Sequence, residues 1–311
     1  IEEIIRRISK ALPPLSAIKV NGQDQSDLLS LGSASEATKD VSKVYLQSPV
    51  GKEIHTYERD IKWQTTSGNN SLELPKFVLS MADGLDEGVA DFHNKVQGLA
   101  SWFIESADDI DLTDTSNGRW RLVYLFRDHN STQENAHLLE FVGYATLLAV
   151  TSPFRKPKAG TILRICQVVI LPPYHRAGHG STMLQQIYAC ANSTQSDEEI
   201  VEINVEDPAP SFQMLRTSVD YGRFVALRAC IKSQPGQSLK ETDALPDFGY
   251  LGQYKVTEKE YYTVSEENLW AVAEQLKITK RQSQIVHELS KLADIERWKK
   301  QQTSITEGTS F

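Results

Sequence analysis

The stretch 164–181, RICQVVILPPYHRAGHGS, limits the fold of this chain more than any other part of the sequence. Residues 165–171 are mostly β-branched or apolar, which predicts a strand buried on both faces. The two prolines that follow cannot donate hydrogen bonds to a neighbouring strand, so they end this one. Gly178 and Gly180 then allow a sharp turn, and apolar residues at helical spacing begin after Ser181. The sequence therefore predicts a strand, a glycine turn and a helix in this order.

A helix N-terminus that follows a glycine turn can bind an anion such as a pyrophosphate, because its first backbone N–H groups lack acceptors within the helix. A Walker loop would place a lysine after the glycines, and no lysine stands there. A Rossmann fingerprint would place a third glycine at the position of Met183. The alternative is a tight turn that binds no ligand, and the glycines alone do not separate the two.

The pattern that remains resembles motif A of the GNAT acetyltransferases, Q/R-x-x-G-x-G/A, whose backbone amides hold the pyrophosphate of acetyl-coenzyme A (acetyl-CoA). In this chain the motif covers residues 175–180, and His175 stands where that superfamily has Gln or Arg. By this resemblance, the residues that bind the cofactor are His175, Arg176, Ala177, Gly178, His179, Gly180 and Ser181.

Three longer strings resemble the type B histone acetyltransferases. They are WFIESADDID at 102–111, ILPPYHRAGHGS at 170–181 and INVEDPAPSF at 203–212, far apart and in the right order. That family has an additional N-terminal stretch that is not found here, and the chain does not begin with Met. We therefore expect a fragment or a processed form.

The resemblance also implies the fold class, which is α/β (α+β). It implies a GNAT-type mixed sheet with a splayed pair of parallel strands, an N-terminal α/β extension and a small C-terminal helical domain. We expect three regions along the chain. These are an N-terminal α/β region with a long helix (1–117), an acetyl-CoA-binding catalytic core (118–225), and a C-terminal linker with helices (226–311).

The spacing of apolar residues predicts the individual elements. Strands are expected at 43–46, 53–59, 119–127, 138–150, 162–171 and 198–205. Helices are expected at 1–12, 86–107, 181–192, after Ser211 as N-cap, and in two segments after Ser265. The apolar run 77–79 is too short to assign. The strand, helix and strand within 162–205 permit a parallel pair, and parallel strands that diverge open a cleft at their carboxyl ends.

An acetyltransferase that acts on lysine needs a general base. The pKa of lysine is about 10.4, so only about one side chain in a thousand is neutral at pH 7. Glu206 and Asp207 stand at the carboxyl end of the second parallel strand, beside the expected cleft. By the resemblance, Glu206 is the general base, Asp207 assists it, and Glu105 is a third candidate. The alternative is a charge pair that complements the dipole of the following helix.

The reaction would be direct attack of a neutral lysine on the acetyl thioester, without a covalent enzyme intermediate. By family analogy, the oxyanion would be stabilised by backbone N–H groups of Val168, Val169 and Ile170, and Ser211 would contact the cofactor. A nucleophilic Cys166 is an alternative. We disfavour it because Cys166 lies inside an apolar strand, where cysteine is usually a small core residue.

Residues 108–114, DDIDLTD, form a dense acidic patch. It is either a solvated loop or a shallow electrostatic trap for a lysine-rich tail. The formal net charge of -8 permits a basic peptide partner. It argues against direct binding to nucleic acid, for which a basic patch would be expected.

The cysteines and the hydropathy exclude further classes. Three widely spaced cysteines without a C-x-x-C motif predict a reducing compartment and neither a disulfide framework nor a metal site. No apolar run approaches the roughly 20 residues of a membrane helix. We expect no signal peptide and no membrane partner.

The leading hypothesis is an acetyl-CoA-dependent histone acetyltransferase. The resemblance implies the N-terminal tail of free histone H4 as substrate, a WD-repeat histone chaperone subunit as partner, and a cytoplasmic and nuclear location. Two alternatives stay open: an acetyltransferase of a small amine, and a non-catalytic module that binds coenzyme A or histones. Long additions at both ends favour a peptide groove, and the two carboxylates argue against a module that only binds.

Overall fold

The computed structural model describes residues 19–20, 23–24, 45–46, 48–60, 74–105, 107–130, 137–155, 157–193, 198–233 and 264–308. The helix expected at 1–12 lies outside these residues. The chain divides into two compact units. The sheet unit comprises Ile1–Thr151, Leu163–Ser196 and Val205–Asp207, and the helical unit comprises Ser152–Ile162, Asp197–Asn204 and Pro208–Phe311.

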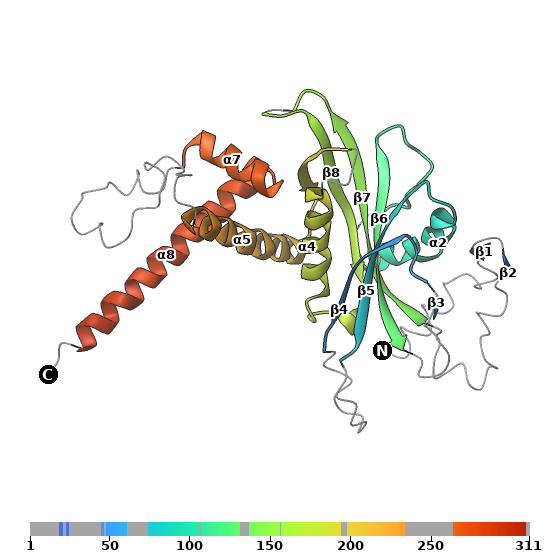
Figure 1. The fold of residues 1–311 in the computed structure, drawn as a ribbon, viewed down its shortest axis with the longest axis horizontal. Helices are drawn as coiled ribbons and strands as arrows, with labels where there is room; N and C mark the ends of the chain where they lie inside the picture. The colour runs from blue at the N-terminus through green and yellow to red at the C-terminus, as the bar shows by residue number, and fades with distance from the viewer. Residues whose placement is uncertain are drawn as a thin grey trace, which may run out of the picture. The chain divides into compact units, whose positions relative to one another are not determined.

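A seven-stranded mixed sheet has the order β4-β5-β6-β7-β8-β9, with β3 paired to β7 (Figure 1). The strands are β3 Tyr45–Leu46, β4 Lys52–Glu58, β5 Lys76–Asp83, β6 Arg119–Asn130, β7 His137–Ser152, β8 Gly160–Ile170 and β9 Ile200–Val205. A separate ladder pairs β1 Lys19–Val20 with β2 Gln23–Asp24. The run 77–79, unassigned from sequence, lies inside β5. The expected α/β class is confirmed.

The strands from β4 to β7 are antiparallel neighbours. Two backbone hydrogen bonds of 2.9 Å join β8 to the β9 segment: Thr161 N–H donates to the Glu199 carbonyl oxygen, and Glu206 N–H to that of Ile165. Because both positions rise together along the chain, these two strands are parallel. The expected parallel pair is therefore present, joined by the helix between the strands.

The helical elements are α2 Val89–Val96, η1 Gln97–Leu99, α3 Ala100–Phe103, η2 Pro172–Tyr174, α4 His179–Asn192, α5 Pro210–Ser233, α7 Glu266–Leu276 and α8 Lys280–Gly308. The single helix expected at 86–107 is wrong. A 3-10 turn that carries Gly98 separates α2 from α3, since glycine is a poor residue for a helix interior. Extended backbone at Ile104 then ends α3.

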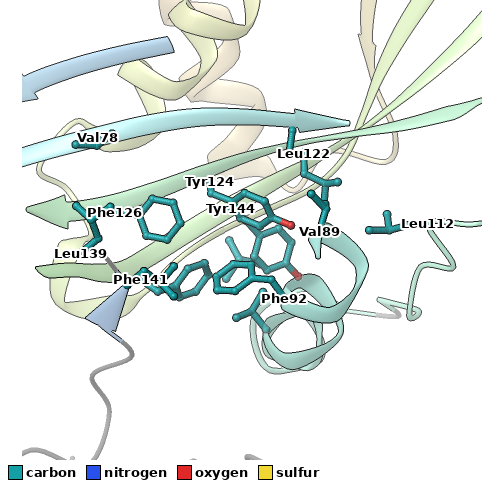
Figure 2. Packing of buried hydrophobic residues seen from close by; sticks show 14 of the residues in the cluster. Val78, Val89, Phe92, Leu112, Leu122, Tyr124, Phe126, Leu139, Phe141 and Tyr144 are labelled. Atoms are coloured by element: carbon teal, nitrogen blue, oxygen red, sulfur yellow. The ribbon is translucent and has the colours of Figure 1, made fainter. Parts of the chain in front are cut away.

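Helix α2 packs against one face of the sheet, and aromatic residues from the helix and the strands form the core between them (Figure 2). The ring of Phe92 lies 5.1 Å from that of Tyr124, 6.2 Å from Phe126 and 6.0 Å from Phe141, measured between centroids. His93 on the same helix is fully buried, and its ring stands edge-on to Tyr144 at 5.1 Å. These contacts explain why apolar residues recur at three- and four-residue steps in α2.

Strand β8 alternates between buried and half-buried residues along its whole length. Val169 and other odd-numbered positions are buried, and Val169 packs into the α2 core. Cys166, Val168 and Ile170 on the opposite face are half-buried. The prediction of a strand buried on both faces is therefore wrong. Its face with Cys166 is left partly open.

A register shift between Leu125 and Phe126 leaves an extra residue in β7, because Leu125 pairs with Gly143 and Phe126 with Phe141. A Cβ on Gly143 would lie 2.3 Å from the Val169 carbonyl oxygen. Glycine is thus required where β7 and β8 approach most closely. A bulge of this kind bends the strand and increases the twist of the sheet.

The helical unit packs α5 and α7 against α8. Asp220 of α5 is fully buried between Arg216 Nε and Arg223 Nη1, each 3.5 Å from one of its oxygens. Ser265 caps α7 by accepting from Asn268 N–H at 3.2 Å. The two helical segments expected after Ser265 are confirmed as α7 and α8. No helix in the described part of the chain is long and apolar enough to span a membrane.

Candidate functional site

The turn before α4 presents a set of backbone N–H donors that have no acceptor among the residues that the structure describes. Gly178 is the N-cap, with φ of 85°, and no side chain caps the helix. The first bond inside the helix runs from Thr182 N–H to the Gly178 carbonyl oxygen at 3.1 Å. Within the described residues, the N–H groups of His179, Gly180 and Ser181 donate to no protein acceptor. This is the arrangement by which a helix N-terminus holds a phosphate group.

His179 is the first residue of α4, two positions before the helix start expected from sequence. Its side chain is only 1% exposed and packs among the rings of Tyr57, Phe77 and Tyr174. Nδ1 lies 2.6 Å from Tyr57 Oη. Burial, with a smaller effect of nearby Arg59, lowers the pKa of His179 to about 4, so the ring is neutral at pH 7. The ring of His179 is therefore packed in the interior and does not face the solvent.

Arg59 directly follows β4, and its guanidinium also contacts the turn. Nη1 donates to the Ala177 carbonyl oxygen at 3.0 Å, and Nη2 donates to Thr182 Oγ1 at 3.3 Å. Neither Arg59 nor Tyr57 is predicted as a site residue from the sequence. Their two-residue spacing puts them on one face of the β4 segment, but no local pattern shows that this face meets a turn more than a hundred residues later.

The other two residues of the motif are exposed. His175 Nε2 lies 2.6 Å from the Ile170 carbonyl oxygen, which holds the ring against the end of β8. Arg176 has a φ of 60°, a left-handed conformation that is uncommon outside glycine.

The carboxyl end of β8 turns two N–H groups toward the β9 edge. Gln167 N–H donates to Thr146 Oγ1 of β7 at 3.1 Å, and Leu171 N–H donates to the Val142 carbonyl oxygen of β7 at 2.9 Å. Since successive residues of a strand face opposite edges, Val168 and Ile170 direct their N–H groups away from β7. Val169 N–H faces β7, as do the N–H groups of Gln167 and Leu171, which argues against Val169 as an oxyanion donor.

Glu206 follows β9 directly and is anchored by its N–H to β8, and its side chain reaches the thiol of Cys166. Burial, with the hydrogen bond and charge of Glu206 next, raises the pKa of Cys166 to about 12. The thiol is therefore protonated at neutral pH, which argues against Cys166 as a nucleophile. Asp207 beside it has a left-handed φ of 32°, and both carboxylates are exposed.

Glu105 and Ser211 are not joined to these residues by a described interaction. Glu105 is exposed in the turn after α3 and makes no hydrogen bond or ion pair with Glu206 among the described residues. Ser211 is exposed in the first turn of α5 and belongs to the helical unit. The expectation that Ser211 is the N-cap is wrong, because α5 begins one residue earlier at Pro210, a residue favoured at the first helical position.

The acidic patch at 108–114 is tied to β8 next to Cys166 and Val168. Gln167 Nε2 donates to the Asp108 carbonyl oxygen at 2.9 Å, while its Oε1 accepts from Tyr144 Oη at 3.3 Å. Asp111 Oδ1 accepts from both the hydroxyl and the N–H of Thr113, which holds the pKa of Asp111 below its usual value. No group of three or more His, Cys, Asp or Glu side chains in the described ranges is arranged to hold a metal ion.

Comparison with known proteins shows similarity to catalytic subunits of type B histone acetyltransferases. The subunit from Rattus norvegicus is 30% identical over 182 residues, which is 58% of this chain and 38% of the relative. One from Dictyostelium discoideum is 29% identical over 178 residues, which is 57% of this chain and 35% of the relative. The resemblance seen in the three strings is confirmed. The chain spans well under half the length of these curated relatives.

The other comparisons add little. No protein-family model matches the chain. The solved structure of the xEco2 acetyltransferase domain bound to a CoA conjugate has 13% identity and a TM-score of 0.35, and the match covers 55% of this chain and 92% of that one. A TM-score this low carries no argument about this chain.

Proposed function

We propose that this chain carries the catalytic part of a histone acetyltransferase that moves the acetyl group of acetyl-CoA to lysines in the N-terminal tail of free histone H4. The observation that carries the proposal is the hydrogen bond between Glu206 N–H and the Ile165 carbonyl oxygen. It fixes a carboxylate beside β8, the strand that leads directly into the turn with free donors. The similarity to histone acetyltransferase subunits supports a histone as the substrate.

The turn would hold the pyrophosphate of acetyl-CoA through the N–H groups of His179, Gly180 and Ser181. A helix N-terminus with no acidic residue in its first turn attracts an anion of this kind. The N–H groups of Val168 and Ile170, which face away from β7, are the proposed donors to the oxyanion. We retain Val169 and Ser211 as cofactor contacts only by resemblance.

Glu206 is proposed as the general base and Asp207 as the carboxylate that supports it, and Glu105 remains a third candidate base. Glu206 accepts a proton from the lysine ammonium, and the neutral amine attacks the thioester carbon. The new C–N bond replaces the C–S bond, and the nitrogen gives up its second proton to solvent as the amide forms. Coenzyme A leaves as a thiolate that takes a proton from solvent. Deprotonation at pH 7 costs about 5 kcal/mol at equilibrium, so a positioned base contributes strongly to the rate.

The basic tail of a histone is also compatible with the charge of this chain. The acidic patch at 108–114 is anchored by Gln167 to the same strand that carries the proposed oxyanion donors. The net charge is -8. A WD-repeat histone chaperone as partner, and a cytoplasmic and nuclear location, are part of this proposal. They rest on the family resemblance alone.

The test compares Glu206→Gln with the wild type on an H4 tail peptide. We expect kcat to fall by roughly a hundred-fold or more, because a general base is lost, while acetyl-CoA affinity measured by calorimetry changes little. Glu199→Gln, a change of the same kind in an exposed glutamate at the start of the β9 segment, is the control and should keep wild-type kcat. Full activity of Glu206→Gln would exclude it as the base.

The substrate class is tested separately. Faster acetylation of spermidine or glucosamine than of the H4 peptide would favour the small-amine alternative. Binding of acetyl-CoA or histone without any turnover would favour the non-catalytic module. Mass spectrometry of the H4 tail after incubation with enzyme and acetyl-CoA identifies the modified lysines directly.

A further inference from the structure

The guanidinium of Arg59 holds the turn before α4 from outside the helix. Arg59 donates hydrogen bonds to the carbonyl oxygen of Ala177, which precedes α4, and to the hydroxyl of Thr182, which lies in the first turn of α4. The fixed fork of donors on a guanidinium suits two acceptors at separate positions, whereas a lysine ammonium is a compact point charge at the end of a flexible chain. Arg59 therefore connects both sides of the segment that carries the free N–H groups.

The glycine at the N-cap makes room for this side chain. A Cβ on Gly178 would lie 2.1 Å from Arg59 Nη1, far inside contact distance. Gly178 thus serves two purposes, since its φ of 85° is also disfavoured for other residues. The guanidinium fills the space that the missing side chain leaves.

The positive charge of Arg59 is unfavourable next to the N-terminus of α4. A cation near a helix N-terminus opposes the positive end of the helix dipole and is destabilising. No carboxylate of the described residues lies within ion-pair distance of Arg59. The nearby His179 is neutral and adds no compensating charge. A bound anion at the helix N-terminus would remove this electrostatic cost.

We propose that Arg59 is a positioning residue for the diphosphate of acetyl-CoA. By bonding Ala177 and Thr182, it keeps the turn in the shape that presents the N–H groups of 179–181 to the ligand. Tyr57 contributes from the same strand by holding the ring of His179. This inference rests on the proposed function, because it names the part of acetyl-CoA that Arg59 serves.

The experiment compares acetyl-CoA with S-acetylpantetheine, a donor of the same thioester that lacks the diphosphate. Wild type, Arg59→Gln, Arg59→Lys and Arg119→Gln are assayed on the H4 peptide with both donors, and acetyl-CoA affinity is measured by calorimetry. Arg119→Gln is the control, since it removes a cation paired with Asp83 at 2.6 Å instead of a cation on the turn. Urea unfolding verifies that each variant is folded.

For Arg59→Gln we expect KM and Kd for acetyl-CoA to rise roughly ten-fold with kcat nearly unchanged, as for the loss of one charged hydrogen-bonded group. The kcat/KM for S-acetylpantetheine should stay at the wild-type value. Arg59→Lys should fall between wild type and Arg59→Gln, and Arg119→Gln should match wild type. If Arg59→Gln does not fold, Arg59→Lys tests the inference instead. The quantity compared is again the ratio of kcat/KM for acetyl-CoA to kcat/KM for S-acetylpantetheine.

Two results would overturn the inference while the proposed function stands: unchanged acetyl-CoA affinity in Arg59→Gln, or equal losses with both donors, which would mean a general structural role. Failure of the wild type to bind acetyl-CoA would instead overturn the proposed function, and the role of Arg59 with it.

Discussion

His93 makes the stability of the sheet unit sensitive to acid. The residue is fully buried under α2, and neither ring nitrogen has a hydrogen-bond partner among the described residues. Burial lowers the pKa of His93 from its ordinary value of 6.5 to about 4. In the unfolded chain the ring takes up a proton near pH 6.5, whereas in the folded chain it does so only near pH 4. Stability is therefore full above pH 6.5 and is lost as the pH falls toward 4.

The magnitude follows from the difference between the two values. At about 1.36 kcal/mol for each pKa unit, the free energy of unfolding should drop by about 3 kcal/mol in total, and by about 2 kcal/mol between pH 7 and pH 5. The pKa of His179 is also lowered to about 4, so it should add a similar loss. Together these losses are comparable with the whole stability of an ordinary domain, about 5–15 kcal/mol.

The variant His93→Leu removes one of the two groups and should lose about 2 kcal/mol less than wild type between pH 7 and pH 5. Urea-induced unfolding at each pH, with pulse hydrogen exchange and mass spectrometry of β6 peptides, reports this unit alone. Asn94→Ala, on the exposed side of the same helix, changes no titratable group and should keep the wild-type pH dependence. A pH dependence in His93→Leu as steep as in wild type would refute the reasoning.

Two further predictions concern the site. Gly178→Ala should destabilise the turn by about 2–4 kcal/mol, because alanine is strained in a left-handed conformation and its Cβ would displace Arg59. The variant should also lose the increase in melting temperature that acetyl-CoA causes. An undiminished increase would contradict this role of the glycine. Cys166 should react with iodoacetamide at pH 8 at least about a hundred-fold more slowly than exposed Cys230, because burial keeps its thiol protonated. Peptide mass spectrometry measures both rates, and comparable rates would show that the Cys166 thiol is not protected.

Local patterns in the sequence predicted the parts of the fold that local chemistry decides. The apolar run, the prolines and the glycines of 164–181 gave strand β8, its end and the start of α4 to within two residues. The helical spacing around Phe92 was read correctly, but the break at Gly98 was not. A periodic pattern continues through a 3-10 turn with little change, so it does not reveal the interruption.

Contacts between distant segments could not be predicted in this way. Arg59 and Ala177 are 118 positions apart, and neither the charge of the arginine nor its neighbours indicate that partner. The half-open face of β8 was missed for a similar reason, because an apolar strand looks the same whether one or both of its faces are covered. The sequence placed Glu206 at the end of a strand, but only the structure shows its side chain beside Cys166.

The place of β4 at the end of the described strand order has a consequence for the turn. An outermost strand has a ladder on one side only, so it is among the first parts of a sheet to detach in thermal fluctuations. When β4 detaches, Tyr57 and Arg59 move away from the turn. The N-terminus of α4 then loses the hydrogen bonds that these two side chains make to it. By reciprocity, any ligand that prefers the braced turn must also keep β4 attached. Strand β4 and the turn at the N-terminus of α4 thus detach and reattach together.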